Sequence, residues 1–225
     1  MTFSIVARCA RTGQFGVAVS SSSPAVGSRC AFARAGVGVV ATQNVTDPRL
    51  GPAGLDLMER GATAAECRDI LVRDNPFRAF RQLVILDREG GTALWAGERI
   101  LGCYAQVAEK NVAAAGNMLA HADVPKAMKE AFCSSSTSLN LGERLLLAME
   151  AGLASGGEAG PVHSAGMLIV DEQSWPLADL RVDWSDEPLG DLRKLWSHWR
   201  PQMYDYVTRC LDPFAAPSYG VPGDR

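Results

Sequence analysis

The sequence predicts an α+β protein built as a four-layer αββα sandwich, in which two antiparallel sheets pack face to face and helix pairs cover the outer faces. Segments with strand periodicity come in blocks, and each block is followed by a pair of helical segments rather than by a single helix. This order disfavours a parallel sheet of the Rossmann type. The 225-residue chain is 47% hydrophobic and 21% charged, which is ordinary for a globular protein with a substantial core.

The first block of strands lies at the N-terminus. Side chains over residues 3–8 alternate between apolar and polar positions, with the period of a strand. Gly13 supplies the positive φ that a hairpin turn requires, and the return strand covers residues 15–21. A further apolar strand covers residues 36–42, after a break at Pro24.

The first helix pair follows this block. Pro52 begins a helix that ends at Gly61. Thr63 and Glu66 have the spacing of a capping box, which begins a second helix that ends before Pro76.

The second block of strands is also followed by a helix pair. We expect strands over 82–86, 92–96, 104–108 and 112–115, helices over 124–132 and 141–154, and a final hairpin that joins 164–170 to 177–182.

Three regions are expected along the chain. Residues 1–185 form the sandwich domain, and residues 186–211 form a C-terminal helix that docks on it through a leucine and tryptophan stripe, interrupted at Pro201. Residues 212–225 are rich in proline and glycine and are expected to form a flexible tail.

Composition excludes several classes of function. The net charge of -3 without a basic stripe argues against nucleic acid as a partner, and no apolar run is long enough for a membrane span. The N-terminus lacks a signal-peptide pattern and the six cysteines are far apart, so we expect reduced thiols and a cytoplasmic location. Nucleotide-binding glycine motifs are absent and the three histidines are widely separated, so neither a cofactor nor a metal is expected.

Many short motifs occur in an order that is typical of one family. They are Thr2 to Ala7, Gly16 to Ser20, Pro24 to Gly27, Ala33 to Gly38, Val40 to Gln43, Gly54 to Leu57, Arg81 to Leu83, Gly116 to Leu119, Ser164-Ala165 and Leu180 to Asp183. Over roughly residues 1–200 the chain resembles the family catalogued as domain of unknown function 1028, which is similar in fold to the N-terminal-nucleophile hydrolases.

The resemblance makes Thr2 the leading candidate for a catalytic residue. In such hydrolases the first residue of the mature chain attacks with its hydroxyl, and its own α-amine, of pKa about 8, takes the proton. A small second residue such as Thr2 generally permits removal of Met1, whereas a retained Met1 would block the amine. The alternative is that Thr2 simply begins an edge strand. Proteasome-type sites also use a lysine, which the second and third strands here lack.

Polar residues in three further places are candidates for substrate binding. Ser20, Ser22 and Ser23 leave the second strand beside the start of the first and are expected to line an oxyanion or carboxylate site, or else to satisfy a local turn.

Gln43, Asn44 and Asp47 follow a buried strand and are expected in a loop, as a binding site or as an Asx-turn. Asn117 ends another strand and must find hydrogen-bond partners if it is buried, in a substrate or in a neighbouring loop.

Glu158 and His163 lie in a glycine-rich loop before a core strand. Together with a nearby hydroxyl they could act as acid–base groups, or the segment could be only a helix C-cap and a polar loop.

Three functions follow from these residues. The first is a hydrolase of a small amide or cyclic amide that uses Thr2 as nucleophile and needs no cofactor. The second is a non-catalytic binding or assembly protein of the same fold. The third is a hydrolase in which Glu158 and His163 activate water. A small molecule is the expected substrate, and exposed sheet edges with the tryptophan-rich C-terminal helix favour a homodimer.

Overall fold

The computed structural model describes residues 1–223 and contains two antiparallel sheets. The first sheet has six strands, in the order β10-β9-β2-β1-β8-β7. Their bounds are β10 (Ala178–Val182), β9 (Ser164–Val170), β2 (Phe15–Ser21), β1 (Thr2–Arg8), β8 (Val112–Asn117) and β7 (Ala105–Glu109). β1 is therefore a central strand, with Phe3 opposite Ser20 on one side and Gly116 on the other.

The second sheet has four strands, in the order β3-β4-β5-β6. They are β3 (Ala31–Arg34), β4 (Gly38–Asn44), β5 (Arg81–Asp87) and β6 (Thr92–Ala96).

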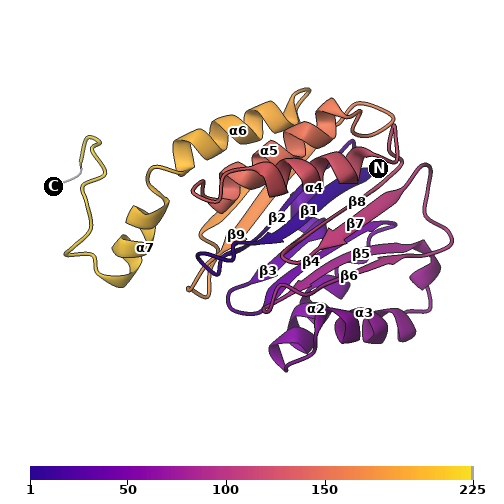
Figure 1. The fold of residues 1–225 in the computed structure, drawn as a ribbon. Helices are drawn as coiled ribbons and strands as arrows, with labels where there is room; N and C mark the ends of the chain where they lie inside the picture. Colours follow the sequence, from indigo (N-terminus) through magenta and orange to yellow (C-terminus); the bar gives the residue numbers. More distant parts are fainter. Residues whose placement is uncertain (224–225) are drawn as a thin grey trace.

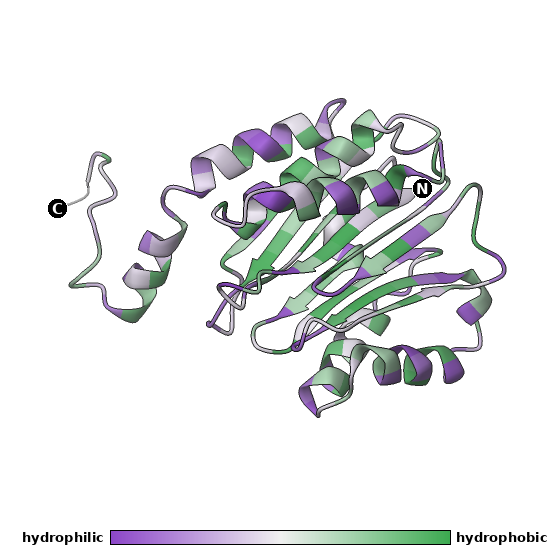
Figure 2. Cartoon of the chain, viewed as in Figure 1, coloured by the Kyte–Doolittle hydropathy of each residue, from purple (hydrophilic) through white to green (hydrophobic). Residues whose placement is uncertain are grey.

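Helices cover the outer face of each sheet, as Figure 1 shows. α4 (Val124–Ser134), α5 (Leu141–Ala154) and α6 (Pro188–Trp199) lie on the six-stranded sheet, whereas α2 (Leu50–Glu59) and α3 (Ala64–Arg73) lie on the four-stranded sheet. The predicted αββα sandwich is confirmed, and in Figure 2 its strands are mainly apolar while its helices interleave apolar and hydrophilic residues.

Side-chain alternation along β1 separates two cores. Phe3, Ile5 and Ala7 point toward the helices α4 and α5, whereas Val6 belongs to the layer between the sheets. Because Thr2 and Ser4 have the same parity as Val6, their side chains also point into the layer between the sheets. The position of Thr2 between the two sheets is therefore a direct result of the strand period.

The C-terminal region contains two helices separated by a turn at Pro201. In α6, Leu189, Leu192 and Trp196 are buried against the six-stranded sheet and its helices. α7 (Met203–Leu211) follows, and residues 212–223 contain neither helix nor strand. In Figure 1, α7 lies beyond one end of the six-stranded sheet, and the segment after it leads away from the sandwich.

Several element boundaries differ from the sequence-based expectations. The short helix α1 (Gly27–Cys30) and strand β3 were not predicted, because these four-residue elements are too short to display a period. α2 begins at Leu50, before Pro52, since proline is tolerated in the first turn of a helix. Gln43 and Asn44 were expected in a loop, but both belong to β4, whose pairing with β5 continues through Asn44.

None of the helices in residues 1–223 has the length and apolar character that crossing a membrane requires.

Candidate functional site

One end of the layer between the two sheets is polar. Thr2, Ser4 and Asn117 enter it from the six-stranded sheet, and Gln43 and Gln82 enter it from the four-stranded sheet. All five residues are buried. Buried polar groups are stable only when they are hydrogen-bonded, so this arrangement requires a network.

The network joins the two sheets through side-chain amides. Ser4 Oγ donates to Gln43 Oε1 at 2.7 Å, and Gln43 Nε2 donates to Gln82 Oε1 at 2.8 Å. Gln82 Oε1 also accepts from Asn117 Nδ2 at 3.1 Å, and Gln82 Nε2 donates to the carbonyl of Gly116 at 3.1 Å.

Asn117 Oδ1 is buried and accepts no hydrogen bond from residues 1–223. Asn117 pairs directly with Thr2 in the ladder between β8 and β1, so this acceptor lies in the row of residues next to the Thr2 side chain. An N–H group of a ligand bound at Thr2 could supply the missing donor.

The Thr2 hydroxyl lies among other hydroxyls and the carbonyl group of Met1. Thr2 Oγ1 contacts the Met1 carbonyl oxygen and lies 3.5 Å from Ser21 Oγ. Ser21 Oγ itself donates to the Met1 carbonyl oxygen at 2.5 Å. The carbonyl group next to Thr2 is therefore already held by a neighbouring hydroxyl.

A chain of hydroxyls continues from Ser21 to a cation. Ser21 Oγ and Ser23 Oγ are 2.8 Å apart, and Arg29 Nη2 donates to Ser23 Oγ at 2.6 Å. Arg29 also donates to the carbonyl of Pro24. In the sequence, Arg29 is one of several arginines near the N-terminal strands. In the fold it belongs to α1, which brings its guanidinium into hydrogen-bonding contact with Ser23.

Glu158 is held against the same segment from the other side. Its two carboxylate oxygens accept from the backbone N–H of Ser22 at 3.2 and 3.1 Å, and the residue is only 4% exposed. A bridge between Glu158 and Leu119 fixes its backbone next to the end of β8.

Burial raises the pKa of Glu158 to about 7. The positive α-amino group of Met1, the hydrogen bonds from Ser22 and the charge of His163 act in the opposite direction. A carboxyl with a pKa near 7 can both take up and release a proton at neutral pH.

Met1 lies between these two segments. Its carbonyl group is bound by Ser21, its amino group acts on Glu158, and a Cβ added at Gly160 would lie 3.9 Å from Met1 Cε. The volume that Met1 occupies is thus lined by the serine segment on one side and by the loop of Glu158 on the other.

The His163 ring makes its contacts with the segment that follows β10. It stacks on Trp184 with 4.5 Å between ring centroids, and Nδ1 lies 3.2 Å from the carbonyl oxygen of Ser185 and 3.7 Å from a carboxylate oxygen of Asp186. Only the backbone of His163 contacts the serine segment, through a 2.8 Å hydrogen bond to the carbonyl of Ser21.

Three other predicted site residues lie apart from the Thr2 hydroxyl. Ser20 has the parity of the helix-facing residues of β2, and its Oγ donates to the carbonyl of Ser164 at 3.0 Å. Asn44 has a φ of 74° and donates to the carbonyl of Phe80 at 2.7 Å. Asp47 forms an ion pair with Arg49 at 2.9 Å, and the side-chain hydrogen bond from Arg49 lowers the pKa of Asp47.

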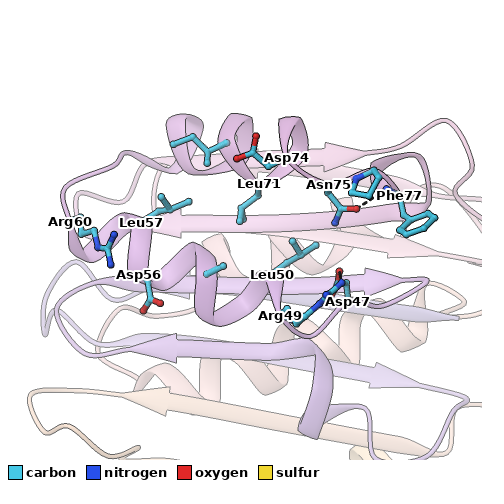
Figure 3. Close-up of a pocket in the computed structure, with 13 residues that line it drawn as sticks. Asp47, Arg49, Leu50, Asp56, Leu57, Arg60, Leu71, Asp74, Asn75 and Phe77 are labelled. Atoms are coloured by element: carbon cyan, nitrogen blue, oxygen red, sulfur yellow. Dashed lines mark hydrogen bonds and ion pairs between the residues drawn. The ribbon is translucent and has the colours of Figure 1, made fainter.

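Asp47 lines a cavity of about 700 Å³ on the outer side of the four-stranded sheet. Figure 3 shows that its lining comes from α2, from α3 and from the segments that precede α2 and follow α3. Leu50, Leu57 and Leu71 give it an apolar wall. This cavity is separated from Thr2 by the four-stranded sheet, so the two places are distinct.

Within residues 1–223, no group of three or more His, Cys, Asp or Glu side chains is arranged to hold a metal ion.

The model of DUF1028, a family of unknown function, matches residues 2–192. No curated protein matches the chain.

Several solved structures are similar to this chain to different degrees. The crystal structure of a DUF1028 protein from Silicibacter pomeroyi is 30% identical, covers 88% of this chain and 88% of its own, and has a TM-score of 0.81. Anbu, an ancestral beta-subunit, from Yersinia bercovieri is 15% identical with a TM-score of 0.39, covering 91% of this chain and 97% of its own. Anbu from Hyphomicrobium sp. strain MC1 is 12% identical with a TM-score of 0.41, covering 92% and 98%.

Proposed function

The chain belongs to the DUF1028 family, whose function is unknown, and we propose that it hydrolyses a small amide or cyclic amide with Thr2 as an N-terminal nucleophile. The observation that supports this function is the arrangement around the Thr2 hydroxyl, which lies beside Ser21 and next to a carbonyl group that Ser21 already binds.

The proposed reaction begins after removal of Met1, which frees the α-amine of Thr2. That amine takes the proton of the Thr2 hydroxyl while Oγ1 attacks the amide carbonyl carbon of the substrate. Ser21 Oγ, which donates to the Met1 carbonyl in this structure, would donate to the oxyanion. The C–N bond then breaks, the leaving nitrogen takes up a proton, and water hydrolyses the acyl-enzyme ester.

Glu158 is proposed as a second acid–base group in this site. Its carboxyl lines the volume that Met1 occupies, and its pKa of about 7 allows it to bind the freed α-amine or to protonate a leaving nitrogen.

The size of the proposed substrate follows from the position of Met1. Its removal would leave a space of about one residue between the serine segment and Gly160. Such a space favours a small amide or a small ring over a long peptide.

A non-catalytic binding protein is the second candidate, and one observation favours it. The side chains between the sheets near Thr2 form a neutral network of Ser4, Gln43, Gln82 and Asn117, and the first lysine of the chain is Lys110. Because the network itself contains no cation, the nucleophile would depend on its own amine and on Arg29 at the end of the hydroxyl chain.

A panel of small linear and cyclic amides, followed by NMR, tests the proposal. Thr2→Ser should retain turnover, whereas Thr2→Val, which has nearly the same shape but no hydroxyl, should abolish it. Thr137→Val removes an exposed hydroxyl far from the site and is the matched control.

Equal turnover by Thr2→Val and the unmodified sequence would contradict the nucleophile. Binding of an amide with no turnover by any variant would favour the non-catalytic function. Loss of turnover in His163→Ala with retention in Thr2→Val would favour water activation by Glu158 and His163.

We also propose a cytoplasmic location. All six cysteines are free thiols in this structure, and three of them are exposed. Exposed free thiols are typical of a reducing compartment.

A further inference from the structure

A second cavity lies at the opposite end of β1 and β2 from Thr2. It has a volume of about 400 Å³ and is enclosed by the turn before β2, the segment after β9, and α7. α7 lies beyond that end of the six-stranded sheet (Figure 1). A volume of this size falls within the range of small-molecule sites in proteins.

A hydrogen-bonded triad fixes the polar wall of this cavity. Gln14 Nε2 donates to Asp171 Oδ2 at 3.0 Å and contacts Tyr204 Oη at 2.8 Å, and Tyr204 Oη donates to Asp171 Oδ2 at 3.1 Å. Gln14 is only 5% exposed and anchors the triad to the protein interior, whereas Tyr204 is 49% exposed.

The triad leaves acceptors without donors. Gln14 Nε2 and Tyr204 Oη both donate to Asp171 Oδ2, and Gln14 Nε2 also donates to Tyr204 Oη, whereas no residue in 1–223 donates to Asp171 Oδ1 or to Gln14 Oε1. Glu172 lines the same cavity, and none of the ion pairs within residues 1–223 includes Asp171 or Glu172.

The charge of this cavity is negative. Its lining includes two carboxylates and no lysine, arginine or histidine. The pKa of the Tyr204 hydroxyl is raised, mainly by burial and next by the negative charge of Asp171. Tyr204 therefore stays protonated as a donor to Asp171.

The remaining wall is apolar and aromatic. Trp175, Leu177 and Val207 line this cavity and also an adjoining cavity of about 270 Å³, to which Trp199 and Tyr206 contribute. Aromatic faces attract organic cations, and apolar walls favour a ligand with a hydrocarbon body.

We propose that this cavity binds a small organic cation, with an N–H-bearing ammonium group at Asp171, Glu172 and Gln14 Oε1 and an apolar body against Trp175 and Leu177. The ammonium group supplies the donors that the acceptors lack and neutralises the carboxylates. This site is separate from Thr2 and does not depend on the proposed hydrolase activity.

Isothermal titration calorimetry with 2-phenylethylamine tests this proposal on the full chain. The neutral analogue 2-phenylethanol has the same ring and chain length and should bind far more weakly. Asp171→Asn should weaken amine binding about tenfold or more, as expected when a charge-assisted hydrogen bond is lost.

Two further variants complete the design. Glu172→Gln changes an exposed side chain, so it should fold normally and still weaken binding. Asp179→Asn removes a carboxylate on β10 that pairs with Arg181, outside the cavity, and should leave amine binding unchanged. Circular dichroism checks that each variant is folded.

The proposal is overturned if the unmodified protein shows no saturable binding of 2-phenylethylamine. It is also overturned if 2-phenylethanol binds equally well, or if the folded Asp171→Asn and Glu172→Gln variants bind the amine like the Asp179→Asn control.

Discussion

Glu158 is buried and lies beside the N-terminal residue of the chain in the fold. Its carboxyl is almost entirely removed from water, and within residues 1–223 its hydrogen-bond donors come from one residue, Ser22, whose backbone N–H lies 3.1–3.2 Å from both carboxylate oxygens. These donors compensate only part of the cost of burying a charge, which explains why burial dominates its pKa. The protonated form is therefore favoured in the folded protein at mildly acid pH.

The raised pKa predicts a pH dependence of stability that belongs to this residue. Between pH 4.5 and about 7 the folded state holds a proton on Glu158 that the unfolded state has released. The free energy of unfolding should therefore fall as pH rises through this window, by an amount on the order of 3 kcal/mol for this group.

Urea unfolding of the unmodified protein and of Glu158→Gln across pH 4.5 to 7 measures this effect. As pH rises, the free energy of unfolding of the unmodified protein should fall relative to that of Glu158→Gln, because glutamine does not titrate. A difference that stays constant would show that the folded pKa of Glu158 is not raised.

Arg29 is predicted to act on the site through Ser23 and Ser21. Its positive charge favours deprotonated groups nearby, so Arg29→Gln should move the acid limb of the pH–rate profile to higher pH and lower kcat about tenfold. Arg29→Lys should restore part of kcat. An unchanged pH profile in Arg29→Gln would contradict this role.

The contact between α5 and α6 depends on the absence of a side chain. A Cβ added at Gly142 would lie 2.4 Å from the ring of Trp196, which is closer than nonbonded atoms approach. Trp196 also donates through Nε1 to Glu143 Oε2 at 3.2 Å, so its ring is fixed over this glycine.

Gly142→Ala should therefore destabilise the protein, by about 1–3 kcal/mol, although alanine is the better helix former. Gly190→Ala in α6 is the matched control, because a Cβ there would meet only Glu187 at 3.9 Å. That change should stabilise by about 0.5–1 kcal/mol. Thermal unfolding of both variants measures the difference, and equal Tm values would contradict the packing argument.

The long elements follow from local patterns in the sequence. α5 and β9 have the predicted bounds, and the capping box of Thr63 and Glu66 is formed as expected. Elements of four residues, such as α1 and β3, display no period and depend on tertiary contacts, so local patterns cannot predict them.

The candidate site was only partly predictable. Thr2, Ser23, Glu158 and Asn117 lie around the N-terminal residue in the fold, although each was a candidate in a separate segment of the sequence. Ser4, Gln82 and Arg29 were missed. A single serine or glutamine inside an apolar strand looks like an ordinary polar position until the strand order brings both sheets together.

The layer between the sheets divides the whole molecule into two halves. At one end it is filled by Val6, Val39, Val84 and similar side chains, and at the other by the amide network. The apolar end holds the sheets together by burial, whereas the polar end places hydrogen-bonding groups beside Thr2. The sandwich is thus asymmetric along its strands.

Gln82 is the residue that connects the sheets at the polar end. Gln82→Leu would leave Gln43 Nε2, Asn117 Nδ2 and the Gly116 carbonyl without their partner, so we expect a loss of about 2–4 kcal/mol of stability. Gln202→Leu, at an exposed position, is the control and should cost less than about 0.5 kcal/mol. Chemical denaturation measures both, and similar values for the two variants would contradict a structural role for the network.

The N-terminal residue of the purified protein tests the central proposal most directly. Intact mass and N-terminal sequencing of protein made without an N-terminal tag identify that residue. Our account predicts a chain that begins at Thr2, with its α-amine free to take the proton of its own hydroxyl. A chain that retains Met1 in every molecule would contradict Thr2 as an N-terminal nucleophile.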